Sequence, residues 1–365
     1  LDSITSGAFN NIAIGDAALT ALTDGDNNVA IGRSALTSAT TGQANTSVGH
    51  ETLISSTTGN FNTAIGHTAL NSNTTANNNT AVGYQSLYAN SVGESNVAIG
   101  YKAMRANTSA SNNTAVGYEA LELNTTGAAN SALGLQALEN NTTGSYNVGL
   151  GFRALEANTT ASENTAVGYQ SLYGNTTGGA NTSMGRMSMG SATVTGNNNV
   201  SVGESTLRFI TSGSNNTALG SKALQQNTTA SYNTAVGYQA GYSITTGGNN
   251  VAVGKEALHS NTTGANNVIM GVGAGESITA ASDNTLVGRL AGRAITATGD
   301  VRNTFVGYLT GYGVTSGTAN TFIGAGPNGG SGENITTGSK NTILGAFNGN
   351  QGGLDIRTSS NNIVL

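Results

Sequence analysis

The chain has 365 residues, only 8% of them charged, with a net charge of -5 and no cysteine. The absence of cysteine excludes a disulfide framework and thiolate metal sites. The lack of a basic patch excludes nucleic acid as an expected partner. The longest apolar runs cover four or five residues, so no membrane insertion is expected in this segment.

A short repeat begins near the start of the chain and continues almost to its end. Asparagine followed four residues later by glycine recurs twenty times. The first eleven of these repeat glycines are 17 residues apart, and later steps are also 17, apart from one each of 18, 19 and 21. Self-similarity at a fixed short period predicts a stacked architecture and not a globule with one central core. The repeat glycines are Gly15, Gly32, Gly49, Gly66, Gly83, Gly100, Gly117, Gly134, Gly151, Gly168, Gly185, Gly203, Gly220, Gly237, Gly254, Gly271, Gly288, Gly307, Gly324 and Gly345.

Each repeat has the composition of one coil of a β-solenoid. The segment from asparagine to glycine, first seen at Asn11–Gly15, is rich in β-forming residues and predicts a short strand. Segments such as Asn124–Gly127, with the sequence Asn-Thr-Thr-Gly, predict a turn. Seventeen residues leave room for two or three short strands and tight turns. We therefore expect an all-β parallel β-solenoid of about twenty 17-residue coils.

The invariant asparagines and glycines are expected to have structural roles. Stacked asparagine side chains can hydrogen-bond to one another and to the turn backbone. Glycine marks a bend with positive φ or a close approach of two backbones. The ladder residues predicted in the central coils are Asn113, Gly117, Asn130, Gly134, Asn164 and Gly168.

Two further positions change together along the chain. We call the residue two before each repeat glycine the inner column, and the residue four after it the leucine column. Up to residue 268 the inner column is small and the leucine column holds Leu or Met, except at Gly241. From Ile269 the inner residue becomes large, as in Ile269, Leu286 and Phe305, and in those same repeats the leucine column becomes Gly275, Gly292 and Gly311. This exchange indicates one shared interior. It divides the chain into residues 1–268 with Ala/Leu-type coils, 269–324 with Leu/Phe–Gly-type coils, and 325–365 with a Gly-rich loop and irregular final coils.

The residue directly before each repeat glycine, here the outer aliphatic column, is aliphatic or Met in all twenty repeats. Side chains alternate along a strand, so this column points outward if the inner column points inward. A stripe of this length exceeds the apolar surface that a monomer exposes to water. We expect it to pack against identical stripes in a homotrimer or a filament; the alternative is a second sheet of the same coil. The expected interface residues are Ile65, Val82, Ile99, Val116, Leu133, Leu150 and Val167.

Two aromatic-rich columns are candidates for contact with glycans. The residue after each repeat glycine, here the ring column, is often Tyr or Phe, and Tyr also occurs five residues after the glycine. Exposed aromatic rings can stack on sugars. The competing interpretation is that they shield grooves between coils or between chains. The candidate glycan-contact residues are Tyr84, Tyr88, Tyr101, Tyr118, Phe152, Tyr169 and Tyr173.

The sequence contains no convincing catalytic pattern. Glu122, Glu139 and Glu156 stand five residues after successive glycines, so stacking brings their carboxylates to about 5 Å, a spacing that retaining glycosidases also use. Nothing suggests a buried pocket, and we expect a solvated column. Three histidines are too few for a metal centre. We predict no enzyme activity, no catalytic or metal-binding residues and no cofactor.

The repeat resembles those of two families of fibrous proteins. Asn96–Gly100, with the sequence Asn-Val-Ala-Ile-Gly, is similar to the head repeats of trimeric autotransporter adhesins. Asn79–Tyr88 resembles repeats of phage tail fibres. These resemblances imply a trimeric left-handed β-roll in an extracellular fibre, on a virion tail or a cell surface, that presents multivalent contacts to a cell-surface glycan or another host receptor.

Two other functions stay open. One is a subunit of a purely structural extracellular filament without a ligand. The other is an ice-binding β-solenoid, because Thr recurs at the turn positions, as at Thr125 and Thr142. The threonines occur as adjacent pairs, which point to opposite sides, whereas an ice-binding face needs both hydroxyls on one side.

Overall fold

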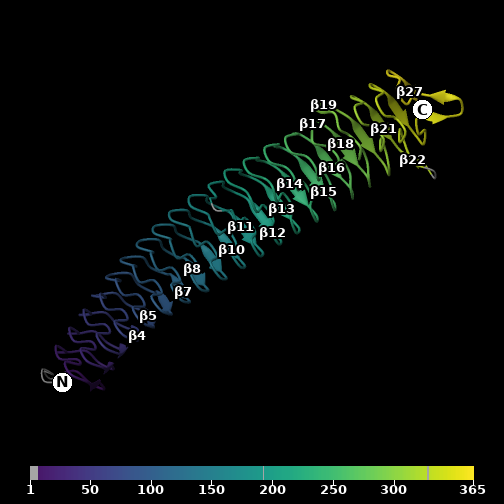
Figure 1. Ribbon diagram of the computed structural model, residues 1–365. Coiled ribbons are helices and arrows are strands. Elements are labelled where there is room, and N and C mark those ends of the chain that lie inside the picture. Colours follow the sequence, from purple (N-terminus) through teal and green to yellow (C-terminus); the bar gives the residue numbers. More distant parts are fainter. Residues whose placement is uncertain (1–6, 192, 327–328) are drawn as a thin grey trace. The chain divides into compact units, whose positions relative to one another are not determined.

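The computed structural model describes residues 7–191, 193–326 and 329–365. The chain forms two compact units, Leu1–Ala180 and Asn181–Leu365. Each unit is a parallel β-solenoid in which one coil follows the next, as Figure 1 shows. Together the units contain about 21 coils of about 17 residues, and no helix occurs in the described ranges. The all-β solenoid fold is therefore confirmed.

Each of the twenty repeats contributes one three-residue strand directly before its glycine. In the first unit each strand pairs in parallel with the strand of the next repeat, so that Ala98 lies opposite Ala115 and Ala115 opposite Ala132. The strands are β1 (Ile12–Ile14), β2 (Val29–Ile31), β3 (Thr46–Val48), β4 (Thr63–Ile65), β5 (Thr80–Val82), β6 (Val97–Ile99), β7 (Thr114–Val116), β8 (Ser131–Leu133), β9 (Val148–Leu150) and β10 (Thr165–Val167).

The second unit repeats this arrangement and adds short strand pairs. Its main strands are β11 (Thr182–Met184), β12 (Val200–Val202), β13 (Thr217–Leu219), β14 (Thr234–Val236), β15 (Val251–Val253), β16 (Val268–Met270), β18 (Thr285–Val287), β20 (Thr304–Val306), β21 (Thr321–Ile323), β24 (Thr342–Leu344) and β27 (Ile363–Val364). A second parallel pair joins β17 (Ala280–Ser282) and β19 (Thr298–Asp300). Two antiparallel pairs join β22 (Ala325–Gly326) to β23 (Gly329–Gly330) and β25 (Asn350–Gln351) to β26 (Leu354–Asp355).

The expectation of two or three strands per coil is wrong for most coils. After each of the first eighteen repeat glycines the chain forms turns in which the second and fourth residues are left-handed, as at Glu119 (φ 53°) and Leu121 (φ 55°). Left-handed residues cannot continue a β-strand. The turn backbone is still bonded between coils: the Glu119 amide donates to Tyr101 in the preceding coil, and the Leu121 amide donates to Ala137 in the next coil.

The inner and leucine columns share the interior of each coil. Ala115 and Leu121 are both completely buried. In the large-residue coils, a Cβ placed on Gly292 would lie 2.8 Å from Leu286 Cδ1, so glycine provides the space that the large inner side chain occupies. Phe305 and Phe322 stack in successive coils with ring centroids 4.8 Å apart. The predicted exchange of volume is confirmed, and it occurs within the second unit.

Serine in the inner column contacts a second hydroxyl that the sequence patterns did not reveal. Ser47 Oγ lies 2.6 Å from Thr52 Oγ1, three residues after the glycine of the same coil, and both residues are buried. Ser201 Oγ likewise lies 2.6 Å from the hydroxyl of Ser188 in the preceding repeat. Each inner serine also donates to the backbone carbonyl five residues later, as Ser47 does to Thr52 at 3.0 Å, so the buried hydroxyl has the partner that burial requires.

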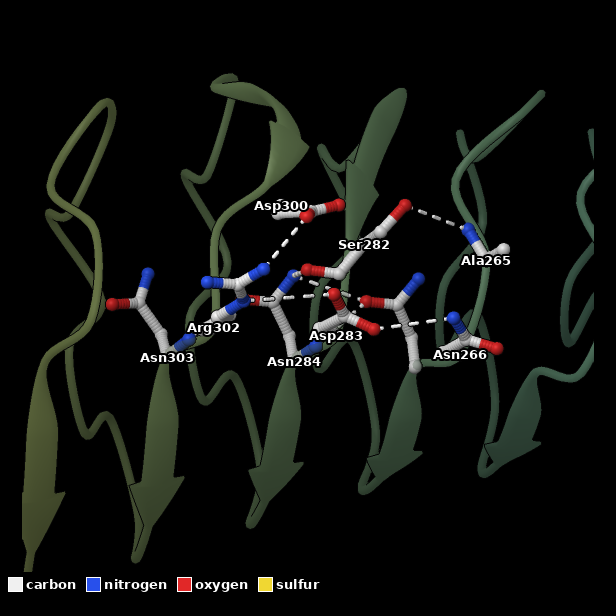
Figure 2. A network of polar contacts seen from close by, with 9 residues as sticks. Ala265, Asn266, Ser282, Asp283, Asn284, Asp300, Arg302 and Asn303 are labelled. Atoms are coloured by element: carbon white, nitrogen blue, oxygen red, sulfur yellow. Dashed lines mark hydrogen bonds and ion pairs between the residues drawn. The ribbon is translucent and has the colours of Figure 1, made fainter.

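Asparagine side chains join the coils through a buried ladder. The backbone N–H of Asn113 donates to Asn96 Oδ1 at 3.0 Å, and the backbone N–H of Asn130 donates to Asn113 Oδ1 at 2.8 Å. Asn130 Nδ2 also donates to the turn carbonyl of Gly144 at 2.9 Å. Figure 2 shows Asn284 and Asn303 of the same ladder on successive coils of the second unit, where the Asn303 amide donates to Asn284 Oδ1 at 3.2 Å.

A second asparagine ladder follows seven residues after the repeat glycines. Asn124 Nδ2 donates to Asn107 Oδ1 at 3.0 Å and to the carbonyl of Gly127 in its own turn at 2.9 Å. The sequence suggested only turn chemistry for these residues. In other repeats an aliphatic side chain occupies the same buried position, as at Ile210 and Ile244. The position therefore accepts a run of amides, a single amide that bonds within its own turn, as at Asn227, or an apolar residue.

The repeat glycines combine positive φ with close contact between coils. Gly134 has φ 135°, and a Cβ on it would lie 2.5 Å from the carbonyl oxygen of Gly151 in the next coil. Any side chain would therefore push adjacent coils apart. This contact explains why glycine is invariant at this position of the repeat.

Replacing Ala115 by Phe should destabilise the stack by about 1–3 kcal/mol, because the interior has no room for the ring. Adding Leu121→Gly in the same coil should recover a large part of that loss, since natural coils combine a large inner residue with glycine there. Urea unfolding of both variants and of Leu121→Gly alone measures the difference. Equal loss in the single Ala115→Phe variant and the double variant would contradict a shared interior.

Asn124→Ile should destabilise the first unit, whereas Asn227→Ile should be nearly neutral. The first change leaves Asn107 Oδ1 and Asn141 Nδ2 without their ladder partner, at about 1–3 kcal/mol each. Asn227 bonds within its own turn and lies between the aliphatic residues of neighbouring coils. Thermal unfolding measures the stability of both variants. A similar loss of stability in Asn124→Ile and Asn227→Ile would show that the asparagine ladder is not what Asn124→Ile disrupts.

Candidate functional site: the outward faces of the coils

The outer aliphatic column lies on the outward face of the strands. Leu133 is 50% exposed and Ile99 is 39% exposed, while Val82, Val116 and Val167 are half-buried by their neighbours. The alternative in which this column faces a second sheet of the same coil is therefore wrong. The other exposed members are Ile14, Ile31, Ile65, Leu150, Met184, Leu219, Val236, Met270, Val306, Ile323 and Leu344.

This strand face carries no charge in any repeat. None of the three strand residues before the twenty repeat glycines is Asp, Glu, Lys or Arg. Several strands also begin with an outward apolar residue, such as Val148 and Val268, both exposed. In a sheet with one solvated face, apolar side chains normally point to the core and polar side chains to the solvent. The outward face therefore carries an uncharged aliphatic stripe in both units, beside Thr, Ser, Val or Ile at the first position of each strand.

The ring column forms a ladder of stacked rings beside this face. The rings of His50, His67, Tyr84, Tyr101 and Tyr118 follow one another on successive coils, with centroids 4.9–5.6 Å apart. Phe152 and Tyr169 form a second stack at 5.2 Å. Each ring face inside a stack is covered by the next ring. The edges of these rings remain exposed, so sugar stacking on their faces is restricted to the ends of each stack.

Tyr88 and Tyr173, in the column five residues after the glycine, are half-buried. The Arg153 guanidinium lies over the Tyr173 ring, with Cζ 5.4 Å from the centroid. The expected solvated carboxylate column is wrong for Glu122 and Glu156, which are buried. Arg105 Nε lies 2.8 Å from Glu122 Oε1, and Arg153 pairs with Glu156. Arginine side chains from the same surface cover these carboxylates and neutralise their charge.

Three carboxylates meet on the same surface. One oxygen each of Glu119, Glu122 and Glu139 lies within 4.8 Å of the others. Gln136 Nε2 donates to Glu119 Oε2 at 3.2 Å, and Arg105 pairs with Glu122. Partial burial and the surrounding carboxylates raise the pKa of Glu139. Glu119 and Glu122 therefore each have a polar partner on this surface. Glu139 is the carboxylate of the three whose negative charge is destabilised.

Turn threonines are used to join coils. Thr125 Oγ1 donates to the carbonyl of Thr142 in the next coil at 3.0 Å, and Thr142 Oγ1 donates to Thr159 at 2.9 Å. The second threonine of each pair, such as Thr126 or Thr143, is exposed. Each coil of this kind therefore presents one threonine to solvent at the turn, where an ice-binding face would need two.

Comparison of the chain with protein-family models and with curated proteins gives no match. Among the described residues, no helix has the length and apolar character needed to cross a membrane.

Glu139→Gln should stabilise the chain at pH 7 by on the order of 0.5 kcal/mol, because it removes like-charge repulsion between stacked carboxylates. Because folding raises the pKa of Glu139, the folded state binds this proton more tightly than the unfolded state does. Protonated Glu139 therefore favours folding at low pH, and this contribution to stability is lost as the pH rises through the pKa of the folded state. The advantage of the variant should therefore shrink near pH 4. Thermal unfolding at both pH values, with Glu163→Gln as a control outside the cluster, measures it; an unchanged advantage at pH 4 would contradict this assignment.

Proposed function

We propose that this chain is part of a structural and adhesive extracellular fibre, a phage tail-fibre shaft or a bacterial surface adhesin, that assembles as a homotrimer. The observation that carries the proposal is the charge-free apolar face that the outer aliphatic column forms in both units. An apolar stripe of this kind marks a protein interface. Identical chains are the simplest partners because their stripes have the same spacing between coils.

The energetics favour association over a soluble single chain. Complete burial of an aliphatic side chain contributes about 1.5–3 kcal/mol, so covering one that is half exposed contributes on the order of 1 kcal/mol. The column recurs in twenty repeats. The sum exceeds the roughly 4–15 kcal/mol that association costs in lost rigid-body freedom. A threefold arrangement lets three stripes meet along one axis and leaves the turn faces available to solvent.

Trimers would also multiply weak surface contacts. Three copies of every outward residue raise the effective concentration of each contact after the first has formed. This multivalency supports an adhesive role without a deep binding pocket. A purely structural filament is the second candidate, because the same apolar face would serve lateral packing without any receptor.

Light scattering of the whole chain should give about three times the 36.3 kDa mass of one chain. Val116→Asp with Val167→Asp should dissociate or misassemble the particle, because two charges enter an apolar interface without partners. Thr126→Asp with Thr143→Asp, on the exposed turn face, is the matched control and should keep the mass. A single-chain mass for the unaltered protein, or an unchanged mass for the valine variant, would refute the proposed interface.

The adhesive part has a separate test in the binding of fluorescently labelled chain to panels of bacterial and animal cells. The assembled chain should bind at least one cell type, and the valine variant should bind at least tenfold more weakly through lost multivalency. Assembly without binding to any of the cells would favour the structural filament.

A further inference from the structure

The residue directly before each ladder asparagine, here the ridge position, is left-handed in all twenty repeats. Short residues dominate it, and Asn is the commonest. Three repeats instead place an aromatic residue there: Phe61 (φ 59°), Tyr146 (φ 60°) and Tyr232 (φ 63°). Bulky residues are uncommon in this backbone region, where strain amounts to about 1–3 kcal/mol. An aromatic residue at the ridge therefore lacks a local structural explanation.

These three rings are among the most exposed large apolar side chains of the protein. Phe61 is 62% exposed, Tyr146 is 66% exposed and Tyr232 is 63% exposed. Unlike the ring column, they form no ring stack with another residue in the described part of the chain. The difference lies in the adjacent coils, because neighbouring ridge residues are not aromatic.

The neighbours of each ring at the ridge leave its faces accessible. Ala44 and Asn78 occupy the ridge on either side of Phe61, and Asn215 and Asn249 occupy it on either side of Tyr232. Tyr146 lies between Ala129 and Glu163. The backbone beneath each ring is held in place, since the amides of Phe61, Tyr146 and Tyr232 donate to the preceding coil at 3.0–3.1 Å. The rings are thus exposed but carried on a fixed backbone.

A polar residue directly precedes each of the three aromatic residues in the sequence. Asn60 precedes Phe61, and its Nδ2 donates to Asn77 Oδ1 at 3.2 Å. Ser145 precedes Tyr146, and its Oγ accepts the Ala128 amide at 3.0 Å; Ser231 precedes Tyr232 in the same way. A serine hydroxyl that accepts one bond can still donate its proton. An accessible aromatic face beside amides and hydroxyls is the combination that binds a pyranose ring, whose C–H face stacks while its hydroxyls form hydrogen bonds.

We propose that Phe61, Tyr146 and Tyr232 are contact points for a neutral polysaccharide, one pyranose ring stacking on each aromatic side chain. The carboxylate of Glu163 beside Tyr146 disfavours an anionic sugar. Phe61 and Tyr146 are five repeats of 17 residues apart in the first unit, on the order of 24 Å at the spacing of paired strands. One extended polymer can therefore contact both, and the weak contacts reinforce each other. This inference rests on the adhesive part of the proposed function.

Affinity electrophoresis of the whole chain in gels containing dextran, mannan or hydroxyethylcellulose tests the proposal. At least one polymer should retard the unaltered chain. The triple variant Phe61→Asn, Tyr146→Asn and Tyr232→Asn should lose at least tenfold in affinity while keeping its fold, because Asn is the commonest ridge residue. Thr126→Asn with Thr143→Asn, at exposed turn positions, is the matched control outside the ridge and should remain retarded. Retardation that survives the triple variant, or that the control variant abolishes, would overturn the proposal, as would the absence of retardation by all three polymers.

A fluorescent reporter tests contact at one ring directly. The chain contains no tryptophan, so Tyr146→Trp introduces a single indole at the ridge. Iodide should quench its emission in the assembled chain, and the polymer that causes retardation should shift the emission and protect it from iodide, whereas polyethylene glycol should do neither. An indole shielded from iodide before any polysaccharide is added would mean that another chain covers the ridge, and it would overturn the proposal.

These results separate the inference from the function on which it rests. Trimers that bind cells equally well with and without the three ridge rings would keep the adhesive function and reject the ridge as its contact. A chain that is retarded through the three rings but has a single-chain mass would keep the ridge contact and reject the trimer.

Discussion

The hydrogen bonds of the buried asparagines set the alignment of one coil with the next. Asn113 Oδ1 accepts from the backbone of Asn130 in the following coil, and Nδ2 donates either to a turn carbonyl, as in Asn130, or to the preceding ladder amide, as in Asn113. Both ends of the amide are thereby satisfied without water. A shift of one coil by a single residue would leave these buried groups unpaired, at about 1–3 kcal/mol for each group. The ladder therefore opposes slippage over every repeat that carries it.

Because the coils are aligned, a residue type that recurs at one position of the repeat forms a continuous strip along the surface. Aliphatic residues before the glycines form an apolar face, and aromatic residues after them form ring stacks. Carboxylates on successive coils approach one another in the same way, and burial together with these neighbouring carboxylates raises the pKa of Glu139. The proposed interface is therefore an extended column of residues. Single side chains are proposed for a function only where they differ from the rest of their column, as Phe61, Tyr146 and Tyr232 do at the ridge position.

The interior exchange illustrates how much could be read from paired positions. The combination of Phe305 with Gly311 predicted a shared interior, because volume lost at one position was gained at the other within the same repeat. The pairing of Ser47 with Thr52 was equally local but was missed. Its signal, a hydroxyl on both sides of one glycine, is recognisable only once the two positions are known to touch.

The sequence by itself determined the period, the strand before each glycine, the inward and outward alternation and the asparagine ladder, since each follows from a residue type repeated at constant spacing. Only the tertiary structure decided that the chain after the glycine turns through left-handed residues such as Leu121, and that Glu122 is buried. It also decided that the rings of the ring column cover one another's faces, whereas the faces of the Tyr146 ring stay exposed. These properties depend on which side chain the adjacent coil places at the same level. Such contacts join residues about 17 positions apart and are not encoded in either local segment alone.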